Sequence, residues 1–220
     1  MHHALNSVNL DIPLELAARD GAAIIRKFVN GEFLKKVQEE VASGPFERAN
    51  LDTDKVSQKF ERCAYLRKIP GMPHLEHLRQ DVEKMIRQCK KSFPVLEKWH
   101  AVDTVVQKYG VGDYLTSHRD LKRNPYLIVI LTIQGYTRFN LRGDTRDSPV
   151  LKQFFPMPSD AIILRANGLL PSLKDIDCRP FHDVRGSEDR TLPRISVTFR
   201  DNLDPDKPIP GFRYLNHHAK

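Results

Sequence analysis

The sequence contains little cysteine, and its three residues, Cys63, Cys89 and Cys178, are scattered without CxxC spacing. An odd number of separated cysteines makes no disulfide framework, so we expect free thiols and a reducing, cytoplasmic location. The longest purely apolar run, from Leu127 to Leu131, is much too short to span a membrane. No charged start followed by an apolar core indicates a signal peptide. Disulfide-rich secreted proteins and membrane-spanning proteins are therefore excluded at this stage.

Runs of one charge sign are also absent. Lysine and arginine total 35 against 28 acidic residues, a net charge of +7, but no run of five or more basic residues occurs. A positive balance favours anionic partners such as nucleic acid, phosphates or carboxylates. The same balance is equally consistent with a basic protein whose charge has no specific partner.

The chain has enough hydrophobic residues to fold as one unit. It has 220 residues, of which 40% are hydrophobic and 29% charged, so disorder is not expected. We predict a single domain in which residues 1–100 form mixed helical support with a possible lid. Residues 101–200 then form a β core, and residues 201–220 an extended tail.

The first hundred residues show helical spacing twice. A short strand is predicted at Ala22–Ile25, and Asn30 is a plausible N-cap for a helix that Gly44 and Pro45 end. A longer amphipathic helix is predicted from about Leu75 to Lys91, with its apolar stripe in the core. Phe46 to Met72 has no clear period and is long for a loop, so it is predicted to be a lid or a substrate-facing segment.

After Val102 the pattern changes to short β-rich runs separated by turn residues. Eight such runs are predicted: Val102–Tyr109, Tyr114–His118, Tyr126–Ile133, Tyr136–Leu141, Val150–Phe155, Ala161–Arg165, Pro180–Val184 and Arg194–Arg200. Eight short strands at this spacing are typical of a jelly roll or a similar double-sheet barrel. The fold class is therefore mainly β with flanking helices (α+β).

The segment His118-Arg-Asp120 is the first indication of chemistry. Residues two apart on an extended segment share a face, so His118 and Asp120 would point the same way. His182 is the only histidine in the later predicted strands and could supply a third ligand. Two imidazoles and a carboxylate on one side of a metal are typical of non-haem Fe(II) enzymes that activate oxygen. HxD alone also occurs by chance, in which case His118 would be an ordinary polar residue.

The strand Arg194–Arg200 carries polar residues on one face and apolar residues on the other. Arg194, Ser196 and Arg200 lie on the polar face, which would look into the barrel. Buried guanidinium groups are costly unless an anion pairs with them, and a small dicarboxylate would do so. An amphipathic edge strand with solvated arginines is the alternative. Gln107 and Tyr109 share a face just before the HxD strand and could hydrogen-bond the same dianion.

These residues occur in the order of a known family. The matching positions are Tyr109, Gly112, His118-x-Asp120, Gly135-Tyr-Thr-Arg-Phe139, Asp160-Ala-Ile-Ile, His182 and Arg194-x5-Arg200. The stretch from Val105 to Arg200 resembles the Fe(II)/2-oxoglutarate-dependent oxygenases, and within them the AlkB-like branch. The resemblance covers nearly half the chain and implies a double-stranded β-helix (jelly roll) core.

The resemblance also implies roles for individual residues. His118, Asp120 and His182 would bind Fe(II), and Arg194 would pair with the distal carboxylate of 2-oxoglutarate. Tyr109 and Ser196, together with Gln107, would support that contact, and Arg200 would lie near the other end of the cosubstrate. O2 would be the oxidant, and ascorbate is the expected reductant in vitro.

Two hypotheses about the substrate follow. The first is hydroxylation of a C–H bond in a small or peptidic, perhaps anionic, substrate, and the second is AlkB-type oxidative demethylation of nucleic acid bases. Gln107 and Lys122 replace the Asn and the second acid that relatives acting on damaged bases carry, which favours the first. Lys122, Arg119 and Arg142 are the candidate substrate contacts. A non-enzymatic ligand-binding barrel is the alternative of another class.

Overall fold

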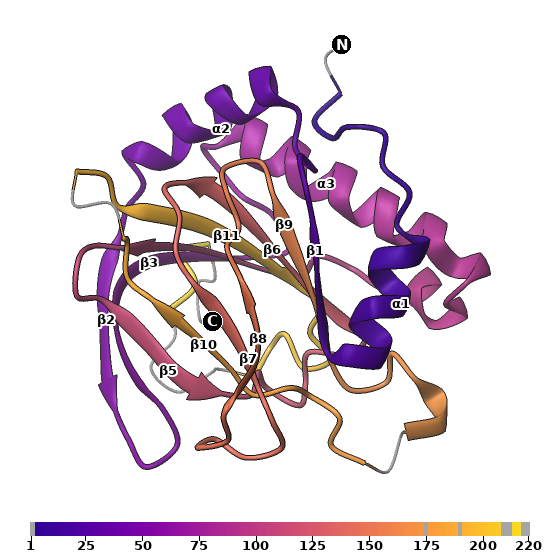
Figure 1. The fold of residues 1–220 in the computed structure, drawn as a ribbon. Coiled ribbons are helices and arrows are strands. Elements are labelled where there is room, and N and C mark those ends of the chain that lie inside the picture. The colour runs from indigo at the N-terminus through magenta and orange to yellow at the C-terminus, as the bar shows by residue number, and fades with distance from the viewer. Residues whose placement is uncertain (1–2, 174–175, 189–190, 208–212, 217–220) are drawn as a thin grey trace.

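A computed structural model describes residues 3–173, 176–188, 191–207 and 213–216. Its strands form one antiparallel sheet that curls into a nearly closed barrel, with α2 and α3 packed on the outside (Figure 1). The order of strands is β1-β9-β6-β11-β4-β3-β5-β10-β7-β8, and β2 pairs with β3. The strands are β1 (Ala22–Ile25), β2 (Glu47–Asp52), β3 (Ser57–Leu66), β4 (Asp103–Tyr109), β5 (Tyr114–His118), β6 (Leu127–Gln134), β7 (Phe139–Arg142), β8 (Val150–Phe154), β9 (Ala161–Arg165), β10 (His182–Arg185) and β11 (Arg194–Arg200). The α-helices are α1 (Asp11–Asp20), α2 (Gly31–Ala42) and α3 (Pro73–Gln88), and the 3-10 helices are η1 (Cys89–Lys91), η2 (Pro94–Lys98) and η3 (Pro171–Leu173).

All eight strands expected after Val102 are present, and the mainly β fold class is confirmed. Two of them begin at least two residues later than expected. β10 starts at His182 instead of Pro180, because proline has no N–H to donate to a ladder. β7 starts at Phe139 instead of Tyr136, because Gly135 has a positive φ and the Thr137 hydroxyl donates to main-chain carbonyls at Arg185 and Gly186.

The helices follow their capping residues. Asn30 caps α2, with its side-chain oxygen accepting from the N–H groups of Glu32 and Phe33 at 3.0 and 3.2 Å. α3 ends at Gln88, and the last three residues of the predicted helix form the separate turn η1. The sequence did not predict α1, a short helix that ends at Asp20 and is followed by a left-handed C-cap at Gly21.

Phe46 to Met72, which showed no clear period in the sequence, contains regular secondary structure. The lid or substrate-facing role stays a prediction. Most of this segment forms the hairpin β2–β3, in which Glu47 pairs with Arg62 and Asp52 with Ser57. β3 also pairs with β4 and with β5, so it is a wall of the barrel. Most of β2 is exposed and β3 is buried on both faces, so neither strand shows the alternation that indicates a half-buried strand.

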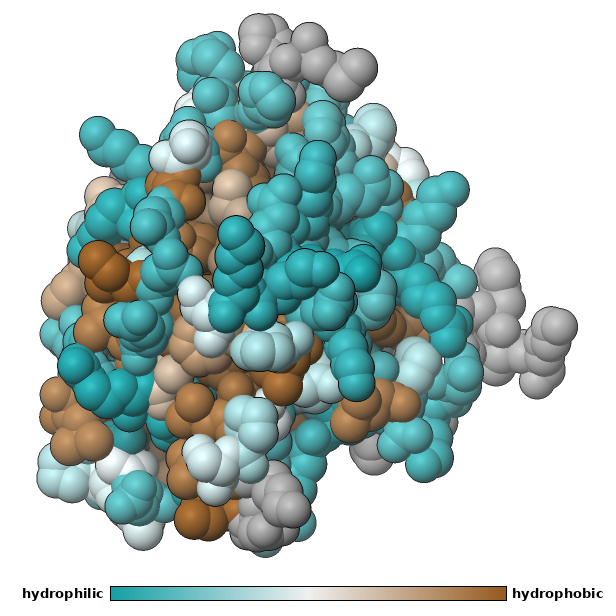
Figure 2. All heavy atoms as spheres, turned by 90° about the vertical axis from the view of Figure 1, so that its right-hand side faces the viewer, coloured by the Kyte–Doolittle hydropathy of each residue, from teal (hydrophilic) through white to brown (hydrophobic). Residues whose placement is uncertain are grey.

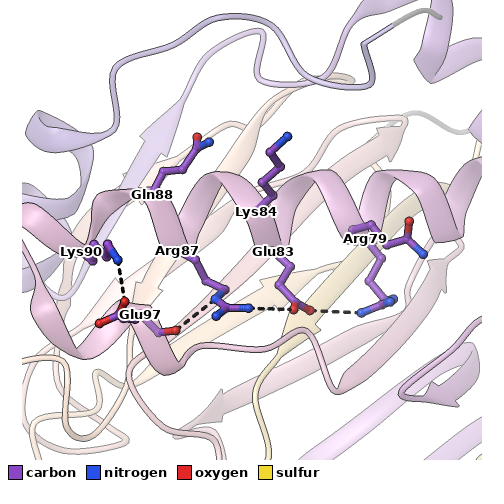
Figure 3. A pocket seen from close by; sticks show the side chains of 8 residues that line it. Arg79, Glu83, Lys84, Arg87, Gln88, Lys90 and Glu97 are labelled. Carbon is purple, nitrogen blue, oxygen red and sulfur yellow. Dashed lines mark hydrogen bonds and ion pairs between the residues drawn. The ribbon is translucent and has the colours of Figure 1, made fainter.

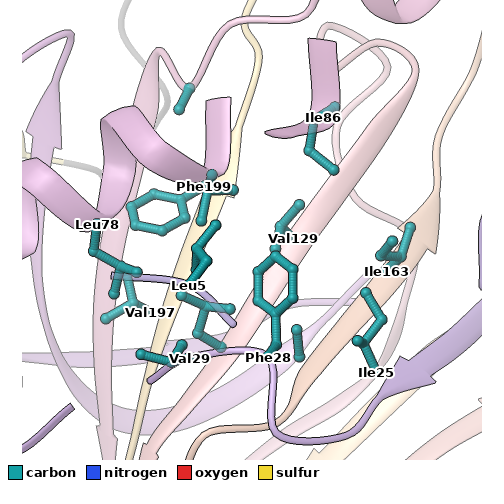
Figure 4. Packing of buried hydrophobic residues seen from close by; sticks show 14 of the residues in the cluster. Leu5, Ile25, Phe28, Val29, Leu78, Ile86, Val129, Ile163, Val197 and Phe199 are labelled. Atoms are coloured by element: carbon teal, nitrogen blue, oxygen red, sulfur yellow. The ribbon is translucent and has the colours of Figure 1, made fainter. Parts of the chain in front are cut away.

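The sheet buries apolar side chains on both faces. On β6, Val129 and Leu131 face the helices, whereas Ile128 and Ile130 face the interior of the barrel. Figure 4 shows strand residues such as Val129 and Phe199 packed with Leu78 and Ile86 of α3. This helix-side core holds the sheet in place, which leaves the interior face to position polar groups.

The face that bears α1 is covered largely by hydrophilic side chains, with smaller hydrophobic patches between them (Figure 2). In the described part of the chain, no helix has the length and apolar character needed to cross a membrane.

The expected division into residues 1–100, 101–200 and 201–220 stays a prediction. Of the expected extended tail, 201–207 and 213–216 form no helix or strand, and 208–212 and 217–220 lie outside the described residues. Tyr214 is buried against β3 and β4, and its hydroxyl donates to Asp103 at 2.8 Å.

Candidate active site

Three potential metal ligands meet at one end of the barrel. His118 ends β5, Asp120 follows two residues later, and His182 begins β10, where it is the direct cross-strand partner of His118. One ligand atom from each of the three lies within 4.8 Å of the others. The Nε2 of His182 is 3.4 Å from Oδ2 of Asp120. The antiparallel pairing of β5 with β10 therefore brings together residues that are far apart in the sequence.

Both histidines are oriented by the main chain. Nδ1 of His118 lies 2.9 Å from the carbonyl oxygen of Thr116, and Nδ1 of His182 lies 3.3 Å from that of Pro180. An N–H donated to a carbonyl fixes the tautomer and leaves Nε2 with its lone pair for a metal. The ring of Phe139 stacks on His182 at 5.3 Å and holds its plane.

The charge states of these groups suit a divalent cation. Burial, followed by the neighbouring His182 ring, lowers the pKa of His118 to about 4, so its imidazole is neutral at physiological pH. Burial would raise the pKa of Asp120, but His182, His118 and Arg200 outweigh it and lower that pKa. Metal binding requires neutral imidazoles and an ionised carboxylate, and the shifted pKa values of His118 and Asp120 meet this requirement. Two nitrogens and one oxygen on one side fit Fe(II).

Among the described residues, no acidic side chain pairs with the buried guanidinium of Arg194. Its side chain lies on the interior face of β11, it is 1% exposed, and its Nε has no hydrogen-bond partner among the described residues. Its guanidinium carbon lies 5.4 Å from the centre of the Tyr109 ring. Burial lowers the pKa of Arg194 to about 10, which still leaves it charged at neutral pH. An unpaired buried guanidinium is costly, so this position fits a carboxylate ligand.

Polar groups surround Arg194 on the same wall. Tyr109 is the cross-strand partner of Arg194, and its hydroxyl accepts from Nε2 of Gln107 at 3.1 Å. The hydroxyl groups of Ser196 and Thr132 are buried and have no hydrogen-bond partner among the described residues. Ser196 pairs with Thr132 of β6 in the sheet, so both hydroxyls line the wall beside Arg194. These orphaned groups fit 2-oxoglutarate, whose distal carboxylate needs several donors.

Arg200 links this wall to the metal ligands. Its Nη1 lies 3.4 Å from Oδ1 of Asp120, and 12% of its side chain is exposed. The alternation expected for this strand is confirmed, because Ile195, Val197 and Phe199 pack in the helix-side core. The interior face of β11 thus carries two guanidinium groups, one beside Tyr109 and one beside Asp120.

The expected substrate contacts lie outside this wall. Arg119 and Arg142 both line a cleft of about 500 Å³ between β7, β8 and the segment before His182. Arg119 pairs with Asp177 at 3.5 Å, and Arg142 pairs with Asp183, the neighbour of His182. Lys122 is exposed and does not line this cleft. The structure therefore brings Arg119 and Arg142 together next to the metal ligands, but not Lys122.

A second cleft, of about 410 Å³, lies on the outer side of α3 (Figure 3). Its charged side chains neutralise one another: Glu83 lies 3.3 Å from Arg79 and 3.9 Å from Arg87, and Lys90 pairs with Glu97 at 2.5 Å. Both of its carboxylates, Glu83 and Glu97, are engaged in these ion pairs, which is what we expect of a solvated helix face.

Sequence reasoning missed two polar residues of the interior. Thr132 directly follows the apolar run Leu127–Leu131 and was counted as part of a buried strand. Arg62 lies in β3, in a region without recognised strands, and is 7% exposed. Period-2 alternation from Phe60 to Ala64 could have placed Arg62 on an inner face, but the buried residues of the opposite face hide that pattern.

No protein-family model matches the sequence, and no curated protein matches it. Solved structures do match the fold. A prolyl hydroxylase from Trichoplax adhaerens, in complex with a peptide fragment of the hypoxia inducible factor oxygen degradation domain, superposes with a TM-score of 0.64 at 14% identity. The match covers 89% of this chain and 90% of that chain.

Two further structures agree. OsALKBH1 gives a TM-score of 0.56 at 15% identity over 82% of this chain and 98% of its own. An oxidoreductase of the 2OG-Fe(II) oxygenase family from Burkholderia pseudomallei gives a TM-score of 0.52 at 12% identity. That match covers 89% of this chain and 91% of the other. At these identities the likeness is one of fold. It confirms the double-stranded β-helix fold that the resemblance implied.

Proposed function

We propose that this protein is an Fe(II)/2-oxoglutarate-dependent dioxygenase that hydroxylates a C–H bond of a small or peptidic substrate. One observation supports this most strongly. His118, Asp120 and His182 converge at the end of a barrel whose inner wall also carries the buried Arg194, for which the described part of the chain provides no anionic partner. A ligand-binding barrel would have no need for both features together.

The chain's own residues have clear tasks in this proposal. His118, Asp120 and His182 would hold the iron. The Nδ1 atoms of the two histidines donate to main-chain carbonyls, which would keep both imidazoles in the ligating tautomer. Arg194 would bind the distal carboxylate of 2-oxoglutarate, with Tyr109, Gln107 and Ser196 around it. Arg200 would restrain Asp120. When bound, iron and 2-oxoglutarate supply oxygen activation, with succinate and CO2 as coproducts.

A nucleic acid base is the second candidate substrate. The structural likeness to OsALKBH1 and the net charge of +7 favour AlkB-type demethylation. The likeness to a prolyl hydroxylase captured with a peptide favours the first candidate. Lys122, at the position where base-demethylating relatives carry an acid, also favours it. A cytoplasmic location, like the substrate roles of Arg119, Arg142 and Lys122, stays a prediction.

The test is succinate formation from 2-oxoglutarate with Fe(II), ascorbate and air. The reaction is run without substrate, with methylated single-stranded oligonucleotides, and with a metabolite and peptide mixture. We expect some succinate without substrate and stimulation by the metabolite and peptide mixture. Stimulation by oligonucleotides alone would establish the demethylase instead. Absence of succinate in every arm, together with no binding of 2-oxoglutarate in calorimetry, would favour the non-enzymatic barrel.

A further inference from the structure

The cleft beside the metal ligands carries a surplus of positive charge among its described residues. Its basic side chains are Arg19, Arg119, Arg142, Lys152, Arg165 and Arg179. Its acidic side chains are Asp20, Asp144 and Asp177, and Asp183 pairs with Arg142 from outside the lining. The six cations therefore exceed these four carboxylates by two charges. We call this site the basic cleft.

Lys152 of β8 shares its carboxylate with an arginine that holds it more closely. Arg19 donates to Oδ1 and Oδ2 of Asp20 at 2.6 and 2.9 Å, whereas Nζ of Lys152 lies 3.6 Å from Oδ2. The hydrogen bond from Arg19 is the main reason that the pKa of Asp20 is lowered to about 2, and Lys152 contributes less. Lys152 is thus the second cation on an acid whose two oxygens are already in use.

Arg119 has the same relation to Asp177. Arg179 donates to the two carboxylate oxygens of Asp177 at 2.7 and 2.5 Å, whereas Nη1 of Arg119 lies 3.5 Å away. The Nε of Arg119 is buried and has no hydrogen-bond partner among the described residues. Arg119 and Lys152 therefore keep donor capacity that no described carboxylate uses.

Lys108 is a lysine of this chain in otherwise similar surroundings. Its Nζ lies 5.3 Å from the centre of the Phe46 ring, and that of Lys152 lies 5.3 Å from the centre of the Phe154 ring. The two lysine side chains are 34% and 41% exposed. Lys108, however, has a carboxylate oxygen of Glu61 at 2.8 Å. A half-exposed lysine can therefore form a short ion pair in this fold, and the long distance at Lys152 belongs to the basic cleft.

The basic cleft adjoins the metal ligands. Arg119 lies between His118 and Asp120 in the sequence, and Leu141, which also lines the cleft, is the cross-strand partner of His182. No described residue of β4 or β11 lines the cleft, so it is separate from the wall that carries the proposed cosubstrate contacts. A ligand in the cleft would thus lie beside the metal without displacing 2-oxoglutarate.

We propose that the basic cleft binds a phosphate monoester group of the primary substrate, with Arg119 and Lys152 as its main contacts. This proposal rests on the proposed function and makes the substrate a phosphorylated small molecule. A phosphate monoester carries close to two negative charges at neutral pH, which matches the surplus. Its oxygens accept hydrogen bonds from several directions, as cations on separate segments require, whereas a planar carboxylate suits a single guanidinium fork. The cleft, of about 500 Å³, also has room for the rest of such a molecule.

The test is calorimetric titration of the metal-free protein at constant ionic strength, so that phosphate has no metal to bind. Phenyl phosphate is compared with diphenyl phosphate, benzoate and phenol, which carry one charge or none. We expect phenyl phosphate to bind at least about 10-fold more tightly than the others, because charge-assisted hydrogen bonds are strong. Lys152→Gln should weaken its binding about 10-fold, and Lys152→Arg should restore most of it.

Lys108→Gln is the matched control and should bind phenyl phosphate as tightly as wild type does. Equal binding of benzoate, no binding of phenyl phosphate by wild type, or an equal loss in Lys108→Gln and Lys152→Gln would overturn the proposal. Unchanged binding in Lys152→Gln would do the same. If an unmodified single-stranded oligonucleotide binds more tightly than phenyl phosphate and needs Lys152, the cleft belongs to a nucleic acid backbone instead.

Succinate formation separates this proposal from the proposed function. Stimulation by a mixture of phosphorylated metabolites should disappear after the mixture is treated with phosphatase. Equal stimulation by the treated mixture would overturn the role of the phosphate. Absence of succinate in every arm would refute the proposed function and with it the substrate role of the cleft. Binding of phenyl phosphate is measured without turnover, so that result would not depend on the same failure.

Discussion

The two faces of β11 differ in what they leave unsatisfied. On the helix side, Ile195, Val197 and Phe199 are buried among apolar side chains. On the interior side, Arg194 and Ser196 are as deeply buried but lack hydrogen-bond partners among the described residues. Equal burial therefore has opposite effects on the free energy of folding. Burial of the helix-side residues stabilises the fold, whereas burial of the interior polar groups destabilises it until a ligand pairs with them.

The most severe change to the interior face is removal of a proposed metal ligand. His118→Ala and Asp120→Ala are each expected to abolish Fe(II)-dependent succinate formation, because two remaining ligands do not hold iron in place. Circular dichroism should show the fold intact in both. Turnover at the wild-type rate in both variants would remove these residues from the site.

Phe199→Ala tests the opposite face of β11. Phe199 is fully buried, so its removal is expected to lower the free energy of unfolding by about 3–5 kcal/mol in denaturant titrations. The KM for 2-oxoglutarate of the folded fraction should stay near wild type. A large change in that KM would show that the two faces are not independent.

Arg194→Met changes the interior face of the same strand without leaving a large cavity. We expect the 2-oxoglutarate concentration for half-maximal turnover to rise about 10- to 100-fold, because charge-assisted hydrogen bonds are lost. In the absence of ligand, the free energy of unfolding should be unchanged or higher, because an unpaired buried cation has been removed. A strong loss of stability with normal cosubstrate affinity would reverse the roles assigned to the two faces.

Asn30→Ala is a small change far from both faces of β11. Loss of the cap of α2 should reduce the free energy of unfolding by about 1 kcal/mol. Cosubstrate affinity should not change, since α2 contributes only to the helix-side core. Calorimetric unfolding together with a 2-oxoglutarate titration would detect any coupling between this helix and the interior.

Much of the site could be predicted because it lies on strands with simple patterns. Arg194 to Arg200 alternates strictly, so the two faces of this strand could be predicted. The same reasoning paired His118 with Asp120, although Asp120 lies just beyond the end of β5. The metal, cosubstrate and substrate roles of these residues stay predictions. What placed His182 beside His118 was strand pairing, which spacing along the chain does not specify.

The β2–β3 hairpin, and Arg62 with it, could not be predicted. Most of β2 exposes side chains on both faces, and β3 buries Cys63 and Tyr65 against the helices while Phe60 and Ala64 face the interior. A strand buried on both sides has no period-2 signal. In the sequence, a lone arginine in such a segment cannot be told apart from an ordinary surface residue. Only the strand pairing shows that it points inward.

The pairing of His118 with His182 also bears on folding. These residues are neighbours across β5 and β10 but lie far apart in the chain, so a metal held by both would act as a removable cross-link closing a long loop. Chelation would cut that link without changing the covalent chain. Amide hydrogen exchange in β5, β7 and β10 should therefore accelerate when the metal is withdrawn, while exchange in β6 and β9, packed under the helices, stays slow.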